Sequence, residues 1–393
     1  MTKIANKETM TLNMGPQHPS THGVLRLIVE LDGEVIQKLT PDIGYLHRGV
    51  EKLAEHRTYH QTIPLTDRLD YLSPMHNNLG YVLAVEKLLG IEAPERAQTV
   101  RVIMAELTRL KSHLLWLACH ALDIGAMTVF IYCFREREKI MDVYERISGA
   151  RMTTNFFRVG GLSSDVYAGF EEDVRRIVAE FPAHFDTYEG LLTKNTIWLQ
   201  RTVGNGVISA EEAIDFGITG PALRGSGVDY DVRRDDPYSG YENYKFEVPL
   251  GNKCDTFDRY KVRLIEMREA LKIIGQALDS LKPGPILADA PKVCYPPKDA
   301  VYNTIEGLIH HFKIASEGFP VPEGEVYQGV ENPKGELGYY IVSDGSAKPY
   351  RMRIRPPSFV NLQAIEKMCK GAMIADLIAV IGSLDIVLGE IDR

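Results

Sequence analysis

The stretch RAQTVRVIMAELTRLKSHLLWLACHAL, residues 96–122, decides the fold class of this 393-residue chain. Its apolar residues recur at helical spacing, as at Val102, Leu110 and Leu117. Pro94 stands where a proline suits the first turn of a helix. The stretch therefore predicts one long helix, and with it a helical core.

Working outward, TVFIYCFREREKIMDVYERIS, residues 128–148, has the same periodicity and predicts an antiparallel partner helix joined near Gly125. Further helices are predicted over residues 46–60, 170–188, 255–281, 300–315 and 364–388. Residues 204–251 are rich in Gly, Asp, Tyr and Arg and predict a loop.

Strands are predicted at two places. Residues 24–35 have β-type side chains on both sides of Asp32-Gly33, which predicts a hairpin, and residues 335–355 alternate as paired strands do. No βαβ series suggests a Rossmann domain. We expect an α+β fold with a helical bundle core and small peripheral sheets.

One domain is expected over residues 1–393. Its parts would be an N-terminal β part over residues 1–45, a helical core over residues 46–315, and a small β part with a C-terminal helix over residues 316–393.

Bulk properties exclude several classes of protein. The net charge of −8 argues against a general nucleic-acid binder. The most apolar stretch, residues 112–134, is interrupted by His113, His120 and Asp123, so no membrane span is expected. The N-terminus lacks an apolar signal core, and the five scattered cysteines form no CxxC pair for a metal. These features favour a cytoplasmic protein.

Three clusters could carry chemistry, and each has a structural alternative. GPQHPSTHG, residues 15–23, places His18 and His22 in a Gly/Pro loop, where they could donate into a pocket or only shape a turn. Tyr71 follows paired acids and an arginine in TDRLDY, which could hold a proton donor or form a surface salt-bridge network. Asp123, near His120, is either a helix cap or a buried functional acid.

Two further features, a histidine pair and a row of arginines, are expected to have structural or surface roles. We expect one side chain of the His310-His311 pair to face the core and the other to face solvent. Arg351, Arg353 and Arg355 share one face of a strand, which suits an interface, an anionic partner or a solvated face.

The whole chain resembles the 49 kDa subunit family of respiratory complex I, known in bacteria as the D-type subunit. The resemblance is carried in order by GPQHPSTHG, LHRGVEKLAE, LTDRLDYLSPM, GARM, RVGGL, GPALRGSG, YDVRRDDPYSGY, LIHHFK, RIRPPSF and LGEIDR.

That family also resembles the large subunit of nickel-iron hydrogenases, so a hydrogenase-like fold is expected. The hydrogenase motifs Arg-x-Cys-Gly-x-Cys and Asp-Pro-Cys-x-x-Cys correspond here to residues that are not cysteine: Asp70, Ser73, Val387 and Glu390. Nickel needs thiolates in that geometry, so no bound metal is expected. The cavity would remain.

The resemblance implies the quinone-headgroup pocket of an ion-translocating NADH-quinone oxidoreductase that is active only as a complex. His22 and Tyr71 would donate to the two quinone carbonyls, with Asp123 as the partner of His22. The pocket would also involve His18, Thr21, Gly23, Asp70 and Val387. Arg48, Arg68 and Thr153 would lie near the terminal iron-sulfur cluster of a partner.

The resemblance also implies the setting of the chain. Quinone would be the substrate, and this chain alone would bind no cofactor. FMN and the iron-sulfur clusters would belong to partner subunits, since no GxGxxG or FMN motif is convincing here. The expected partners are the B-type subunit with the terminal cluster, the C-type subunit, and the H-type subunit that forms the quinone channel in the membrane. The location would be peripheral, on the cytoplasmic side of the bacterial inner membrane.

Thr153 departs from the family pattern, since many members have a histidine at this position. Threonine does not titrate near neutral pH, so a weakly pH-dependent cluster potential is expected. The alternative for the whole chain is a metal-free, hydrogenase-like scaffold that only docks the iron-sulfur partner.

Overall fold

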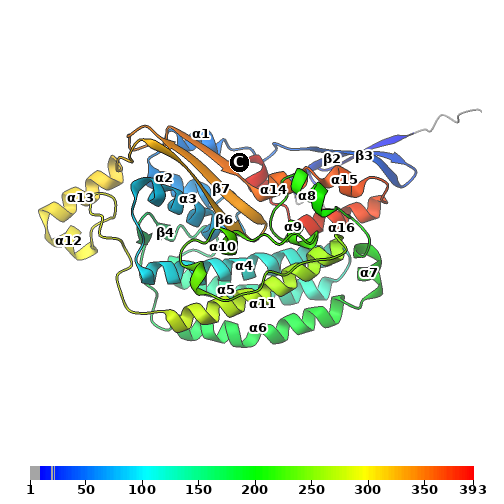
Figure 1. Cartoon of the computed structure of the whole chain (residues 1–393), viewed down its shortest axis with the longest axis horizontal. Helices are drawn as coiled ribbons and strands as arrows, with labels where there is room; N and C mark the ends of the chain where they lie inside the picture. The colour runs from blue at the N-terminus through cyan, green and yellow to red at the C-terminus, as the bar shows by residue number, and fades with distance from the viewer. Residues whose placement is uncertain (1–8, 19–20, 22) are drawn as a thin grey trace, which may run out of the picture.

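A bundle of long helices forms the body of the protein (Figure 1). The computed structural model describes residues 9–18, 21 and 23–393. The bundle helices are α4 (Glu95–Asp123), α5 (Met127–Ser148), α6 (Phe170–Leu192) and α11 (Thr256–Ser280). They pack as a ring in which α4 contacts α5 and α11, and α6 closes the ring against the same two helices. The predicted helical core and the pairing of the first two long helices are confirmed.

Helix α4 lies at the centre of the molecule and is buried on nearly all sides, including charged residues such as Arg101, Glu106 and Arg109. Buried charges need partners. Arg101 pairs with Glu86 at 2.6 Å, and Arg109 pairs with Glu106 at 3.1 Å. The polar residues of α4 are therefore part of the core rather than a solvated face.

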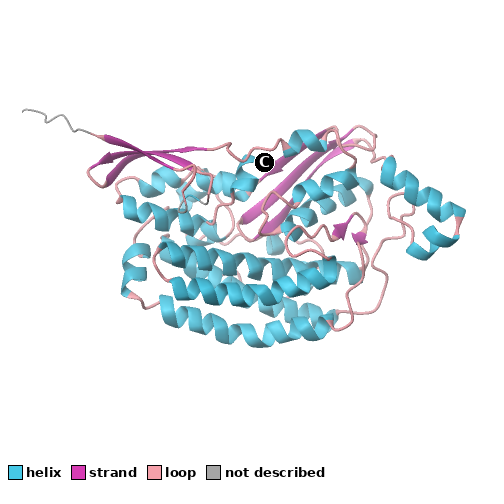
Figure 2. Ribbon diagram, turned by 180° about the vertical axis from the view of Figure 1, so that it is seen from behind, coloured by secondary structure: helices cyan, strands magenta, loops and turns pink. Residues whose placement is uncertain are grey.

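Within the described residues, two three-stranded antiparallel sheets and one two-stranded ribbon flank the bundle (Figure 2). The strands are β1 (Met10–Met14), β2 (Arg26–Asp32), β3 (Val35–Asp42), β4 (Phe157–Arg158), β5 (Gly161–Leu162), β6 (Gly324–Asn332), β7 (Gly335–Ser343) and β8 (Arg351–Arg355). Gly33 turns the β2–β3 hairpin with φ 64°, so the predicted hairpin is confirmed. The predicted pairing of β7 with β8 is also confirmed. Strand β6 was not predicted.

Helix α3 (Pro74–Leu89) lies between the β6–β7–β8 sheet and the bundle. It was not predicted either. It packs on β6, β7 and α4. A side chain at Gly80 would come within 3.0 Å of Val330 and Tyr339, so this glycine allows the close approach of helix and sheet.

The shorter helices correct several predicted boundaries. They are α1 (Val50–Ala54), α2 (Tyr59–Thr66), α7 (Thr196–Thr202), α8 (Ala210–Asp215), α9 (Pro221–Gly225), α10 (Val232–Asp235), η2 (Tyr241–Asn243), α12 (Lys298–Asn303), α13 (Ile305–Ser316), α14 (Pro357–Leu362), α15 (Ile365–Cys369), α16 (Ile374–Leu384) and α17 (Leu388–Asp392). Several of these short helices lie in the predicted loop over residues 204–251.

Three predicted helices are interrupted. The helix over residues 46–60 is wrong as one element, because Thr58 caps a new helix, α2. Thr304 likewise separates α12 from α13. The C-terminal helix is broken at Gly371 and at Asp385, both of which have positive φ. His310 and His311 are both exposed, so the expectation that one faces the core is wrong.

The C-terminus is fixed against the segment before α1. The Asp392 carboxylate accepts hydrogen bonds from the backbone N–H groups of Gly44 at 2.8 Å and Leu46 at 2.6 Å. The His47 ring lies 2.7 Å from the Asp392 carbonyl oxygen. These contacts hold α17 against the segment that precedes α1.

Candidate functional site

The candidate site forms where three connections meet: the α2–α3 turn, the β6–β7 turn and the α16–α17 junction. The ammonium of Lys334 lies 3.2 Å from Asp70 Oδ2 and 3.4 Å from Asp385 Oδ2. It also donates to Ser112 Oγ on α4 at 2.7 Å. These four residues are buried and are called the lysine centre below.

Charge balance holds the lysine centre together. Burial alone would lower the pKa of Lys334, but Asp385 and Asp70 outweigh it and raise that pKa, so the amine is a cation. Burial raises the pKa of Asp385, and the Lys334 cation opposes this rise. A single buried ammonium thus lies between two carboxyl groups.

Glu390 extends the centre as a neutral acid. Burial, and then the Asp70 charge, raise its pKa to about 8, so it is protonated at neutral pH. Its Oε1 accepts a hydrogen bond from the Ser358 backbone at 3.1 Å and another from the Ser358 hydroxyl. The same hydroxyl oxygen accepts from Val387 N at 3.2 Å.

On one side of the site, the backbone of α17 lies close to the backbone of the α2–α3 turn. A side chain at Gly389 would come within 2.5 Å of the Leu69 carbonyl oxygen. The Arg48 guanidinium donates to the carbonyl oxygens of Arg68 at 2.5 Å and Gly389 at 3.2 Å. Glycine at this position therefore lets α17 close on the turn that carries Asp70.

Tyr71 follows Asp70 in this turn and is half-buried. Burial and then the Asp70 charge raise the pKa of its phenol, while Lys334 acts in the opposite direction. The phenol therefore keeps its proton at neutral pH and can donate a hydrogen bond. The structure brings Tyr71 and Asp70 together with Val387 and Glu390 at this centre.

Asp123 ends α4 and is half-buried. Burial raises the pKa of its carboxyl to about 6, and the charge of His18 opposes this rise. His18 therefore lies within electrostatic reach of Asp123. His22, the predicted partner of Asp123, lies outside the described residues.

The β1–β2 loop carries the other predicted pocket residues. Thr21 is buried, and its hydroxyl donates to the His18 carbonyl oxygen at 2.9 Å. Gly23 is exposed and has φ 95°. Beside His18, an apolar hollow of about 320 Å³ lies between β1 and α16 and is lined partly by Met14 and Ile378.

Cys119 was missed by sequence reasoning. Its thiol lies within electrostatic reach of the Tyr71 phenol, and burial raises the pKa of that thiol to about 11, with smaller effects from Asp123 and Asp385. The thiol is therefore neutral and lies among the candidate residues. Its spacing, four residues before Asp123 on one helix face, was the available signal.

Arg48 and Arg68, two of the residues predicted to lie near a partner's iron-sulfur cluster, lie close together. Burial and the nearby Arg68 lower the pKa of Arg48. Thr153 is exposed in the segment after α5. Two residues beyond it, the Asn155 backbone hydrogen-bonds to Asp67, whose pKa burial raises to about 7. The segment after α5 thus contacts the α2–α3 turn.

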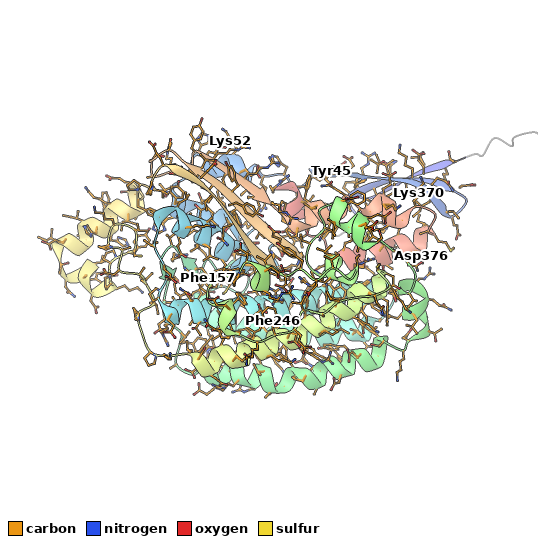
Figure 3. All side chains as sticks on the ribbon, in the orientation of Figure 1. Tyr45, Lys52, Phe157, Phe246, Lys370 and Asp376 are labelled. Carbon is orange, nitrogen blue, oxygen red and sulfur yellow. The ribbon has the colours of Figure 1, made fainter. Side chains whose placement is uncertain are left out.

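A buried network of charges continues beyond the lysine centre. Arg224 pairs with Glu266 at 2.7 Å, and His113 Nε2 lies 2.9 Å from the other Glu266 oxygen. Burial lowers the pKa of His113 to about 4, so this ring is neutral. At the far edge of this network, the Arg233 guanidinium lies 4.7 Å from the centre of the Phe246 ring. Phe246 is labelled in Figure 3.

Across the described ranges 9–18, 21 and 23–393, no group of three or more His, Cys, Asp or Glu side chains could hold a metal ion. In the same part of the chain, no helix is both long enough and apolar enough to cross a membrane.

The fold and the site define a class: an α+β protein with a central helical bundle, whose connections enclose a buried lysine between acids beside a protonated tyrosine. Residues 123–393 match the family described as the respiratory-chain NADH dehydrogenase 49 Kd subunit. The chain belongs to this family.

Relatives match over nearly the full chain. The D subunit of the NADH-quinone oxidoreductase of Geobacter metallireducens is 85% identical, covering 99% of this chain and 100% of the relative. The protein of the same name from Geobacter sulfurreducens is 84% identical over the same shares. The D 2 subunit of the same enzyme from Chloroflexus aurantiacus is 56% identical over 98% of this chain and 95% of its own length.

Proposed function

We propose that this chain forms the quinone-headgroup pocket of an NADH-quinone oxidoreductase and is active only within that complex. The observation that carries the proposal is the Tyr71 phenol, half-buried beside the lysine centre and holding its proton. Reduction of a quinone to a quinol takes two electrons and two protons. A phenol and an imidazole can polarise the carbonyls and supply the protons.

Each residue has a proposed role. Tyr71 donates to one quinone carbonyl and His22 to the other. Asp123 pairs with the histidine and returns a proton to it, and its raised pKa of about 6 suits proton exchange near neutral pH. His18 is a second proton carrier close to that carboxyl.

The remaining pocket residues shape the cavity: Thr21, Gly23, Asp70 and Val387. The apolar hollow beside His18 supports the proposal, because a quinone carries an apolar tail.

The electrons come from a partner. Arg48 and Arg68, with Thr153, face the terminal iron-sulfur cluster of the B-type subunit, which receives electrons from NADH through FMN and other clusters. This chain binds no cofactor of its own in the proposal. The C-type and H-type subunits are the other proposed neighbours. The complex translocates ions across the bacterial inner membrane, and this chain lies peripherally on the cytoplasmic side of that membrane.

The proposed ancestry is a nickel-iron hydrogenase large subunit. Support comes from the positions where hydrogenases have cysteine, which are connected by contacts in two pairs here. Asp70 pairs with Lys334, and Ser73 N donates to the Asp70 carbonyl oxygen at 2.9 Å. Val387 and Glu390 share the Ser358 hydroxyl. In this proposal a buried ammonium among carboxyl groups takes the place of a metal among thiolates.

Tyr71→Phe in the assembled complex tests the proposal. It should abolish most NADH:quinone activity, because the phenol proton is lost, while NADH oxidation by ferricyanide persists. Tyr350→Phe, at an exposed tyrosine, is the matched control and should change neither rate. Full quinone activity in Tyr71→Phe would favour the scaffold alternative.

Thr153 gives an independent test of the cluster-side assignment. The terminal-cluster potential should vary weakly with pH in this complex, and Thr153→His should make it vary steeply. A redox titration at several pH values measures both. A steep slope in the unmodified complex would contradict the assignment.

A further inference from the structure

A helical hairpin projects from the body of the protein (Figure 1, yellow). It consists of α12 and α13, which pack mainly against each other. α12 buries no residue, and α13 buries Gly307 and Ile314. Isolated helices shorter than about 12–15 residues are marginal in water, so this hairpin needs a surface that covers it.

The hairpin exposes large apolar side chains. Tyr302 is 84% exposed, Ile305 75% and Phe312 65%. Leu308 and Ile309 add to this patch. Contiguous exposed apolar surface rimmed by polar residues marks an interaction site, and aromatic residues are enriched at the cores of protein interfaces.

The patch continues into a groove between the hairpin and the body. The groove has a volume of about 1250 Å³, and Tyr302 and Leu308 belong both to its lining and to the patch. Cofactor and drug-sized pockets measure about 300–1,000 Å³. The groove exceeds this range and therefore has room for an extended polypeptide segment.

Stacked rings form part of the groove. The His60 ring stacks on Tyr295 with 4.9 Å between centroids, and Tyr295 meets His311 of the hairpin at 5.4 Å. His60 is neutral, because burial lowers the pKa of its ring to about 4. These rings link the hairpin to the body and give the groove a preformed wall.

The charged lining of the groove is mostly basic. Arg158 and Lys298 are its cations, and Asp289 is its carboxylate. The hydrogen bonds of the Arg158 guanidinium go to neutral oxygen atoms, among them the Asn155 side-chain oxygen at 2.7 Å, and the Asp67 carboxyl acts on it without a hydrogen bond. Anionic-lipid sites use clusters of about 4–8 basic residues. Two cations beside an apolar, aromatic surface instead complement a protein segment that carries carboxylates.

We infer that this groove and the α12–α13 patch dock an apolar, carboxylate-bearing segment of a neighbouring subunit of the same complex. The inference rests on family membership and on the groove, and is independent of the proposed quinone chemistry. Complementary charge on the partner would face Lys298 and Arg158, while its apolar side chains would cover Tyr302 and Phe312.

Photo-crosslinking in the intact complex tests this inference. p-Benzoylphenylalanine at position 302 should capture a peptide of another subunit that contains apolar residues and at least one Asp or Glu. Capture of lipid, of a second copy of this chain or of this chain alone, a peptide without carboxylates, or no product would overturn it. The same probe at Tyr350, on another exposed loop, should not capture that peptide.

Charge reversal provides the second measurement. Lys298→Glu should lower the yield of the product about fivefold, the order expected for an exposed ion pair turned repulsive. Lys292→Glu is the matched control, because Lys292 is an exposed lysine of the loop before α12 and lies outside the groove lining. Equal yields in the two variants would refute the charge match.

Discussion

Lys334→Met removes the buried cation that the site is built around. In the native chain the ammonium meets Asp70 at 3.2 Å and Asp385 at 3.4 Å, with no solvent exposure of its side chain. Methionine has a similar length and fills the same space without charge. Two buried carboxyl groups would then face each other unpaired.

The expected loss of stability is large. At an effective dielectric of about 20, each such pair interacts by roughly 5 kcal/mol. Protonation of the carboxyl groups offsets part of this loss, and breaking one buried pair costs roughly 3–5 kcal/mol in total. At roughly 2 °C per kcal/mol for a chain of this size, the melting midpoint should fall by about 6–10 °C.

Heating isolated membranes and following proteolysis of this subunit by mass spectrometry measures that midpoint. Lys111→Met is the matched control, since Lys111 is also buried and its amine lies 4.1 Å from the centre of the Tyr144 ring. Burial lowers the pKa of Lys111 to about 7, so its loss should cost little. A shift below 2 °C for Lys334→Met, or equal shifts in both variants, would refute the reasoning.

Three further outcomes are expected. Glu390 has a pKa of about 8 in the fold against an ordinary 4.5, so its contribution to stability is lost as pH rises between these values. Glu390→Gln should therefore flatten the fall in melting midpoint from pH 5 to 8. An unchanged slope would contradict this. Asp123→Asn should remove a limb near pH 6 from the pH profile of quinone reductase activity, and an unchanged limb would contradict this. Gly389→Ala should destabilise the fold by roughly 1–3 kcal/mol, because the added Cβ meets the Leu69 carbonyl oxygen. Gly190→Ala, in open space on α6, should instead stabilise the fold by about 1 kcal/mol in the same melting assay.

The long elements were predictable because their signal is local. The periodicity of residues 96–122 and the Asp32-Gly33 turn each report on neighbours within a few residues. Helix α3 and strand β6 were missed, because they pack on each other and their faces are set by contacts distant in sequence. The breaks at Thr58, Thr304 and Asp385 depend on single caps within apolar stretches.

The sequence by itself determined the family and the helical core, because the identity and order of residues suffice for these. It also named Tyr71, Asp70 and Asp123. Only the tertiary structure decided what lies between the carboxyl groups. Lys334 is 264 residues from Asp70 by number (334 − 70), yet their charges meet at 3.2 Å. Such a contact follows from how the sheet, α17 and the bundle pack, and no local pattern encodes it.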